Sequence, residues 1–457
     1  MGKLIFIFFF LSSLVFAYET EIISGNRLIV CDHGAEMLEW DLEFLAHATQ
    51  SIEISGSFCG GSSFRDCLRV IDCRMEIYPD LQTHILSCVP LLESEDFKMV
   101  HLLEKKYPKR FHFQLSITEV ILFPYTTTID NHVKMVVVDG TYFSAGATNL
   151  DETMTTDGLG PGPTNNKGKV IGATLPSAQR DTDVVGKGPI AIEMRKEFFK
   201  LFALWKHYGC KRKLIQDPDY FSDQTNYFEV DLSQVLDIEV FENSSRVIDN
   251  VPIQMLLSGP HQKNNVITQK YEQLIKEAKE DIVIANLYSF PMGNIPEYLM
   301  EKGREEIPIT LITNGYYDDS PFFCSHFGWA NRSIFLPLFC GKHYHLWQKS
   351  KCKKDKVCPV SIYEFHLPNI LYHQKMMVID HRLSIIGSYN LGMKSHHGDY
   401  EMIFVIDHPR VAQDLLNVIE IDKNYSELIS FEQACDWYFD LTIDWLARNQ
   451  KKIHIFY

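Results

Sequence analysis

One group of chemically reactive side chains occurs twice in the sequence. Each copy holds an imidazole, an ammonium and a carboxylate, which are His132, Lys134 and Asp139 in the first copy and His373, Lys375 and Asp380 in the second. Side chains two residues apart in an extended strand point to the same face, so each histidine lies beside its lysine. An imidazole can attack or carry a proton, and a neighbouring ammonium can hold an anion. The pattern therefore predicts phosphate chemistry.

A glycine and an asparagine follow each copy at the same spacing. They are Gly146 and Asn149 in the first copy and Gly387 and Asn390 in the second. Glycine lets the backbone approach closely, and the amides add hydrogen-bond donors. The two copies together provide enough donors for the non-bridging oxygens of a tetrahedral phosphate. One histidine would attack the phosphorus while the other protonates the leaving oxygen.

These residues resemble the signature of the phospholipase D superfamily, His-x-Lys-x4-Asp followed by Gly-Ser-x-Asn. The second copy matches throughout, whereas the first has Ala147 where the signature has serine. The resemblance implies two similar lobes whose motifs form one active site, and a covalent phosphohistidine formed without a metal or other cofactor. It implies that His132 is the nucleophile. His373 would then protonate the leaving group and activate the incoming water or alcohol.

The resemblance also implies supporting roles. The phosphate would be held by lysines and asparagines together with a serine: Lys134, Lys375, Asn149, Asn390 and Ser388. An acid in the strand after each motif would orient a histidine, Asp183 for His132 and Glu401 for His373. Asp139 and Asp380 belong to the motif but lie at the far end of its strand, so we expect them to act as structural partners.

Strands and helices alternate before each motif. Helices are predicted over 36–49 and 94–107 and strands over 51–57 and 111–117 before the first motif. A helix over 266–278 and strands over 281–288, 307–313 and 360–365 are predicted before the second. The runs 135–138 and 376–379 are apolar and β-branched, which is typical of buried central strands. The predicted class is α/β, with two similar lobes that each hold a mainly parallel or mixed sheet flanked by helices.

The length of 457 residues suits more than one domain. We predict lobes over 18–245 and 246–457, because residues 242–250 are polar and without a strong pattern. Residues 197–205 include apolar and aromatic positions that predict a buried helix face. The segment 155–179 is rich in Gly, Pro, Asn and Thr and predicts a loop, either a lid or a plain insertion. His396 and His397 lie between Asn390 and Glu401, where they would line the pocket or sit in a surface loop.

The N-terminus has the features of a signal peptide. Lys3 precedes an apolar run that starts at Leu4, and small residues lead to a predicted cleavage after Ala17. We therefore expect an exported or secreted protein. An uncleaved anchor and a buried N-terminal strand are the alternatives. The chain has 11 cysteines, and some are expected to pair if it is exported.

The net charge of −15 argues against a protein that coats nucleic acid non-specifically. Together with the 30 phenylalanines, the negative charge favours a phospholipid or other phosphodiester as the substrate. We expect the protein to be a monomer that binds peripherally to a membrane surface. The expected function is a metal-independent phosphodiesterase of phospholipase D type that hydrolyses phospholipid. Two alternatives remain: an exported single-strand nuclease of the same superfamily, and an inactive phospholipid-binding scaffold.

Overall fold

The computed structural model describes residues 17–87, 94–122, 125–159, 178–208, 238–260, 264–316, 328–344, 348, 357–367 and 370–440. The chain divides into an N-unit, Ile22–Ile253, and a C-unit, which joins Gln254–Tyr457 to Met1–Glu21. The division falls inside strand β12 (Ile248–Ser258), slightly after the predicted boundary. Strand β1 (Tyr18–Glu19) pairs with Leu256 and Leu257 and so belongs to the C-unit, which the sequence did not indicate.

The sheet of the N-unit is mixed. Its strand order is β12, β2 (Ile23–Cys31), β11 (Asp183–Lys187), β9 (Tyr142–Gly146), β8 (Met135–Val138), β3 (Ser51–Gly56), β4 (Gln82–Ser87) and β5 (Phe111–Leu115). Strands β3, β4 and β5 run parallel to one another. The pairs from β3–β8 to β2–β12 are antiparallel. The α/β class is confirmed, with parallel pairing confined to one side of the sheet.

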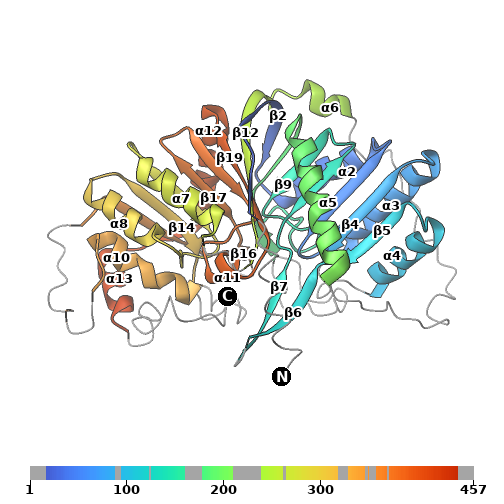
Figure 1. Cartoon of the computed structure of the whole chain (residues 1–457). Helices are drawn as coiled ribbons and strands as arrows, with labels where there is room; N and C mark the ends of the chain where they lie inside the picture. Colours follow the sequence, from blue (N-terminus) through green and yellow to red (C-terminus); the bar gives the residue numbers. More distant parts are fainter. Residues whose placement is uncertain are drawn as a thin grey trace. The chain divides into compact units, whose positions relative to one another are not determined.

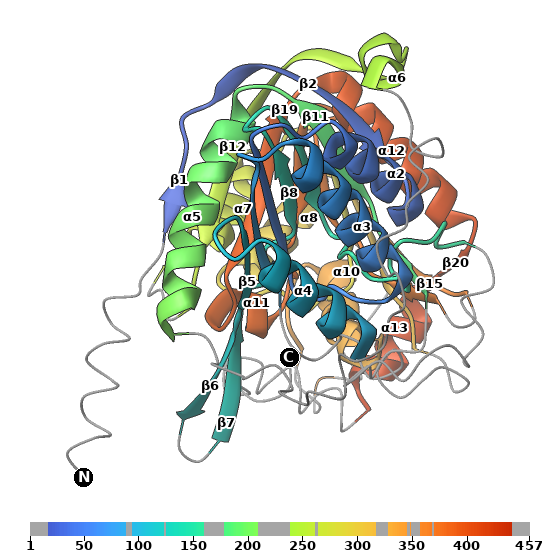
Figure 2. The same cartoon turned by 90° about the vertical axis from the view of Figure 1, so that its right-hand side faces the viewer.

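Helices cover both faces of this sheet. Helix α5 (Ile190–Tyr208) lies on one face, and α2 (Gly34–Ala46) with α3 (Gly61–Ile77) lies on the other (Figures 1 and 2). Phe198, Leu201, Phe202 and Trp205 of α5 are buried, as the sequence predicted, whereas Phe199 and Leu204 are half-buried. Helices α4 (Ser94–Lys106) and α6 (Ile238–Asn243) complete the unit, and the hairpin of β6 (Ile117–Leu122) and β7 (Tyr125–Asp130) extends away from it. Helix α3 and strand β4 were not predicted.

The C-unit repeats this arrangement. Its strand order is β20 (Ser426–Leu428), β15 (Val360–Phe365), β14 (Ile309–Asn314), β13 (Ile282–Asn286), β17 (Lys375–Ile379), β18 (Leu383–Gly387), β19 (Glu401–Asp407) and β12. Strands β13, β14 and β15 are parallel, as β3, β4 and β5 are. The pairs β13–β17, β17–β18 and β18–β19 are antiparallel. The second motif strand, β17, thus occupies the same place as β8.

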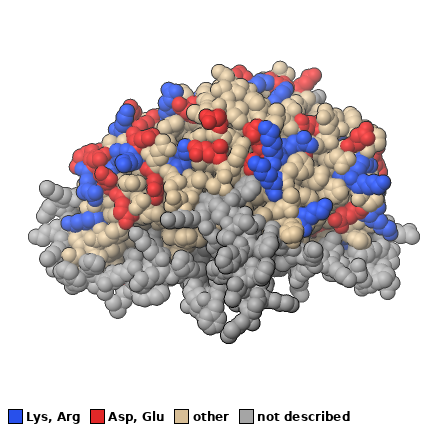
Figure 3. All heavy atoms as spheres, in the orientation of Figure 1, with Lys and Arg blue, Asp and Glu red and all other residues tan. Residues whose placement is uncertain are grey.

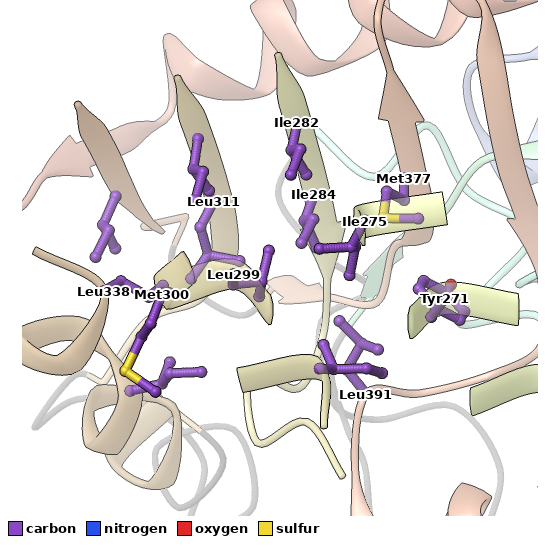
Figure 4. Close-up of a cluster of buried hydrophobic side chains, with 14 of the residues drawn as sticks. Tyr271, Ile275, Ile282, Ile284, Leu299, Met300, Leu311, Leu338, Met377 and Leu391 are labelled. Carbon is purple, nitrogen blue, oxygen red and sulfur yellow. The ribbon is translucent and has the colours of Figure 1, made fainter. Parts of the chain in front are cut away.

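An apolar core fixes the strands of the C-unit against its helices. Figure 4 shows Ile282, Ile284 and Leu311 of β13 and β14 facing Tyr271 of α7 (Val266–Glu277) and Leu299 of α8 (Ile295–Arg304). Burying each such side chain is worth about 1.5–3 kcal/mol. The remaining helical elements are η4 (Arg332–Ile334), α10 (Phe335–Cys340), α11 (Met393–His397), α12 (Pro409–Lys423) and α13 (Phe431–Tyr438), and a short strand, β16 (Ile370–Tyr372), precedes the motif.

Several predictions concern parts of the chain that lie outside the described residues. The predicted signal peptide falls almost wholly there, as do residues 160–177 of the predicted loop, whereas Ala178 and Gln179 form the start of strand β10 (Ala178–Arg180). Seven described cysteines have free thiols, so the predicted pairing is not found among them: Cys31, Cys59, Cys67, Cys73, Cys340, Cys358 and Cys435.

The described surface and helices bear on possible partners. Acidic and basic side chains are interspersed over the described part of the face in Figure 3, as expected for a chain without a broad basic surface. No helix in the described ranges combines the length and apolar character needed to cross a bilayer.

Candidate functional site

The first histidine–lysine pair lies at the start of the buried strand β8. Lys134 is only 2% exposed, and its Nζ donates to the backbone oxygen of His132 at 2.9 Å and to Ser57 Oγ at 3.0 Å. His132 is half-buried. The four residues of β8 are all buried, so the strand holds the lysine firmly. His132 and Lys134 lie just before β8, and the lysine side chain contacts the backbone of the histidine.

The second pair is closer still. Lys375, again 2% exposed, donates to the backbone oxygen of His373 at 2.7 Å, and its Nζ lies 3.0 Å from His373 Nδ1 and 2.9 Å from Nε2. His373 is buried. An ammonium buried among neutral acceptors keeps much of its field, because little water screens it. The second pair therefore offers an anion a fixed positive charge beside an imidazole.

The third motif residue serves the backbone in both units. Asp139 accepts hydrogen bonds from the amides of Thr49, Gln50 and Ser51 at 2.8–2.9 Å. Asp380 does the same for three amides of the C-unit, those of Lys279, Glu280 and Asp281. Both aspartates have positive φ, 53° and 52°, at the turn that ends the motif strand. Each ties that turn to the start of the neighbouring strand, which supports the expected structural role.

Replacing Asp139 with alanine is expected to lower the free energy of unfolding by about 2–3 kcal/mol, because three backbone amides, those of Thr49, Gln50 and Ser51, lose a charged acceptor. Activity per folded molecule should change little. Urea unfolding measures the first quantity, and Asp249→Ala, at an exposed carboxylate, is the control. A folded Asp139→Ala protein that had lost turnover would instead place this carboxylate in the chemistry.

The tail of the first motif is held by Asp183. Its carboxylate accepts from the backbone amide of Thr148 at 3.0 Å and from Thr148 Oγ1 at 2.5 Å. A Cβ on Gly146 would lie 2.2 Å from Asp183 Oδ1, so only glycine fits there. Burial raises the pKa of Asp183 to about 7, and the nearby charge of Asp181 adds to this. Thr148, the residue after Ala147, thus gives its hydroxyl to Asp183.

The tail of the second motif is held by Glu401. Its carboxylate accepts from the hydroxyls of Ser388 and Ser395, and Ser388 Oγ also accepts from the amide of Met402 at 2.9 Å. Ser388 therefore supports the acid, where the resemblance implied a contact with phosphate. His396, which the sequence placed in a pocket wall or a surface loop, is anchored to α7, with Nδ1 2.7 Å from Thr268 Oγ1.

The strand register shows which acid of the N-unit corresponds to Glu401. Gly146 lies opposite Asp183 in the first unit, whereas Gly387 lies opposite Ile403 in the second. Counting back two residues from each partner makes Asp181 the equivalent of Glu401. Asp181 is fully buried. Aligning the two halves of the sequence matched Asp183 with Glu401, because both tails contain two acids separated by one residue. The first tail is longer, so the sequence alone does not show which residue of β11 pairs with Gly146.

The two tail asparagines differ. Asn149 is 1% exposed, and its Oδ1 accepts from the amides of Ser57 at 2.9 Å and Phe58 at 3.2 Å. Asn390 is 8% exposed, and its Oδ1 has no hydrogen-bond partner among the described residues. In the C-unit the corresponding backbone tie is made by Asn286, whose Oδ1 accepts from Tyr288 and Leu391. Asn390 is therefore the asparagine better placed to serve a ligand.

Comparisons with known proteins agree with this organisation. A family model described as "Cardiolipin synthase, PLD-like domain" matches residues 271–422. Cardiolipin synthase A of Buchnera aphidicola subsp. Acyrthosiphon pisum (strain Tuc7) is 27% identical over 198 residues, 43% of this chain and 35% of the relative. Cardiolipin synthase of Geobacillus kaustophilus (strain HTA426) is 25% identical over 303 residues, 66% of this chain and 48% of the relative. The matches thus span less than half the length of these relatives.

The fold has a match along almost the whole chain. The crystal structure of phosphatidylserine synthase from Haemophilus influenzae Rd KW20 aligns with a TM-score of 0.60 at 13% identity, covering 95% of this chain and 97% of that one. At that identity the likeness concerns the fold. The family match and the cardiolipin synthase relatives, together with the duplicated motif beside equivalent buried strands, support the likeness to the phospholipase D superfamily.

Proposed function

We propose that this protein cleaves phospholipid phosphodiester bonds through a covalent phosphohistidine and passes the phosphatidyl group to water or an alcohol. The observation that carries the proposal is the presence of two intact histidine–lysine pairs at the starts of two equivalent buried strands, β8 and β17. Both pairs retain an imidazole and a buried ammonium. This argues against the inactive scaffold, which would not require either pair.

The proposed reaction has two displacements. A ring nitrogen of His132 attacks phosphorus, the bond from phosphorus to the leaving oxygen breaks, and His373 gives that oxygen a proton. Water or an alcohol then loses a proton to His373 and attacks the phosphorus. The phosphorus–nitrogen bond breaks, and both histidines return to their starting states. Lys134 and Lys375 stabilise the charge that develops on the non-bridging oxygens.

Two acids are proposed to orient the histidines: Glu401, and Asp181 in place of the Asp183 first expected. Asp181 replaces Asp183 in this proposal because the strand register makes Asp181 the equivalent of Glu401. A carboxylate beside an imidazole fixes its tautomer and stabilises its charged form. Asp183 keeps a separate role as the acceptor of Thr148.

Asp181→Asn is expected to lower kcat by about 10²–10⁴-fold, as is Glu401→Gln, because a histidine is left in the wrong tautomer. Asp183→Asn should mainly lower stability. Steady-state kinetics and thermal unfolding of the three variants separate these effects. A large loss of kcat with Asp183→Asn and near-normal kcat with Asp181→Asn would restore the assignment first made from the sequence.

The proposed substrate is a phospholipid, which the names of the cardiolipin synthases support. Those names also favour transfer to an alcohol, so hydrolysis and transfer are proposed as competing outcomes of one intermediate. The test uses the full chain on mixed vesicles of phosphatidylglycerol and phosphatidylethanolamine in EDTA, with and without added glycerol. Headgroup release or exchange supports the proposal. Activity restored only by Zn²⁺ contradicts the metal-free mechanism, and cleavage of single-stranded DNA alone would favour the nuclease.

We also propose that the protein is exported by its N-terminal segment. The support is the sequence pattern before Ala17. Cleavage after Ala17 would leave β1, which starts at Tyr18, intact on β12. The mature chain would therefore keep every strand of the C-unit sheet described above.

A further inference from the structure

A small cavity lies behind the first motif strand. It has a volume of about 10 Å³ and is lined by α2, β8, β9 and the tail of the motif. Polar side chains among its lining residues are Asp41, Ser55, Lys134, Ser144, Thr148 and Asp183. A single water needs roughly 10–15 Å³ and two to four polar partners, so the space and its lining suit one water.

Asp41 is the least satisfied group on this cavity. It is fully buried on α2, and neither carboxylate oxygen has a hydrogen-bond partner among the described residues. Burial raises the pKa of Asp41 to about 8, the charge of Asp183 adds to this, and the neighbouring Ser144 opposes it. A buried carboxyl without a partner is costly unless it is protonated and hydrogen-bonded.

The C-unit shows that the fold does not require this polar cluster. Ile52 lies opposite Val138 and Ile282 opposite Ile379, so the two units align without gaps from these strands back into α2 and α7. That alignment and the motif register give three pairs of equivalent positions: Asp41 and Tyr271, Thr148 and Tyr389, Asp183 and Ile403.

At these positions the C-unit has buried side chains of a different kind. Tyr271, Tyr389 and Ile403 are all at most 2% exposed, and the two tyrosine rings lie 5.8 Å apart. Large rings fill the C-unit where the N-unit has two carboxyls, a threonine and a cavity. The polar cluster is therefore a feature of the N-unit alone.

We propose that the cavity is a binding site for one ordered water, held jointly by the carboxyl groups of Asp41 and Asp183. Protonated Asp41 would donate a hydrogen bond to the water, and the water would donate one to Asp183. The Ser144 hydroxyl can form a further hydrogen bond with the water. Since Asp183 also holds Thr148, the water would link α2 to the tail of the first motif. Asp41 would then be a positioning residue for that tail.

The first test measures stability against pH and does not depend on the proposed function. The folded chain keeps a proton on Asp41 between about pH 5 and 7, whereas the unfolded chain has released it, so stability falls as pH rises. The other ionisable groups facing Asp41 are Lys134, Asp183, Cys31 and Cys67. Both thiols have raised pKa values and stay neutral in this range.

Urea unfolding of the full chain is therefore expected to show a specific difference. Between pH 5 and 7, the folding equilibrium constant of the wild type should fall with each pH unit by a factor about tenfold larger than that of Asp41→Asn. A tenfold change per pH unit corresponds to one proton bound in the folded state and released on unfolding. Tyr271→Phe, at the matching position of the C-unit, should leave the slope unchanged. Equal slopes for the wild type and Asp41→Asn would overturn the proposal.

A second test uses the wild type and remains decisive if Asp41→Asn does not fold. A high-resolution crystal structure should show one water within about 2.6–3.2 Å of both carboxyl groups. Carbon-13 NMR of labelled aspartates should show a carboxyl that remains protonated at pH 6. A collapsed or empty cavity, or a cation between two ionised carboxylates, would contradict the proposal whether or not the protein cleaves phospholipid.

Discussion

Replacing His132 with asparagine is expected to lower phosphodiester turnover by at least about 10³-fold, and His373→Asn by a similar factor. His132 would lose the nucleophile, and His373 would lose the group that protonates the leaving oxygen. In the proposed mechanism the two histidines act in one reaction, so the double variant should be barely slower than either single variant. Initial rates of headgroup release measure all three.

The histidine prediction needs a control for folding. His408 is the N-cap of α12, where its Nδ1 accepts from the amide of Arg410 at 3.2 Å. Asparagine is a good N-cap, so His408→Asn should keep both stability and turnover. If either motif variant retained a near-normal rate, or if the losses multiplied in the double variant, a single shared reaction would be excluded.

Replacing Lys375 with methionine is expected to lower kcat/KM by about 10²–10³-fold, and Lys134→Met should act similarly. Each variant removes a buried ammonium placed beside a histidine, so the developing charge on phosphate loses its nearest positive partner. Stability should be equal or slightly higher, because a methionine of similar length buries no charge. Kinetics and thermal unfolding measure the two effects together.

An exposed lysine provides the control. Lys196 on α5 is 59% exposed and pairs with Glu193, so Lys196→Met should change neither quantity appreciably. Opposite signs for activity and stability are the specific expectation for the motif lysines. A strong loss of stability with little loss of activity would mean that the lysines serve the fold and not the phosphate.

Much of the fold could be predicted from the sequence because local patterns determine it. The strand over 360–365 and the apolar runs of β8 and β17 lie where their β-branched patterns indicated. The helices α4 and α7 were predicted to within a residue or so at each end. Helix α3 was missed because it carries charged residues among its apolar ones and begins at glycines, Gly60 and Gly61.

The histidine–lysine pairs of the site could be predicted from the sequence, whereas the acids and asparagines around them could not be assigned correctly. The placing of His132 and Lys134 next to each other just before β8 is a local property, so the sequence determines it. The correspondence of Asp181 with Glu401 depends on strand register across an insertion, which no local pattern contains. Asn149 bonds backbone amides, whereas in the C-unit Asn286 of another strand makes the corresponding bonds in place of Asn390.

The central claim is that His132 carries the phosphatidyl group, and trapping that intermediate tests it most directly. The full chain would be mixed with phospholipid labelled at its phosphate, quenched within one turnover and digested, and the labelled peptide identified. We predict an acid-labile, base-stable label on the peptide that contains His132, present in the wild type and absent from His132→Asn. Label on no histidine peptide during active turnover, or the same label in His132→Asn, would contradict the account.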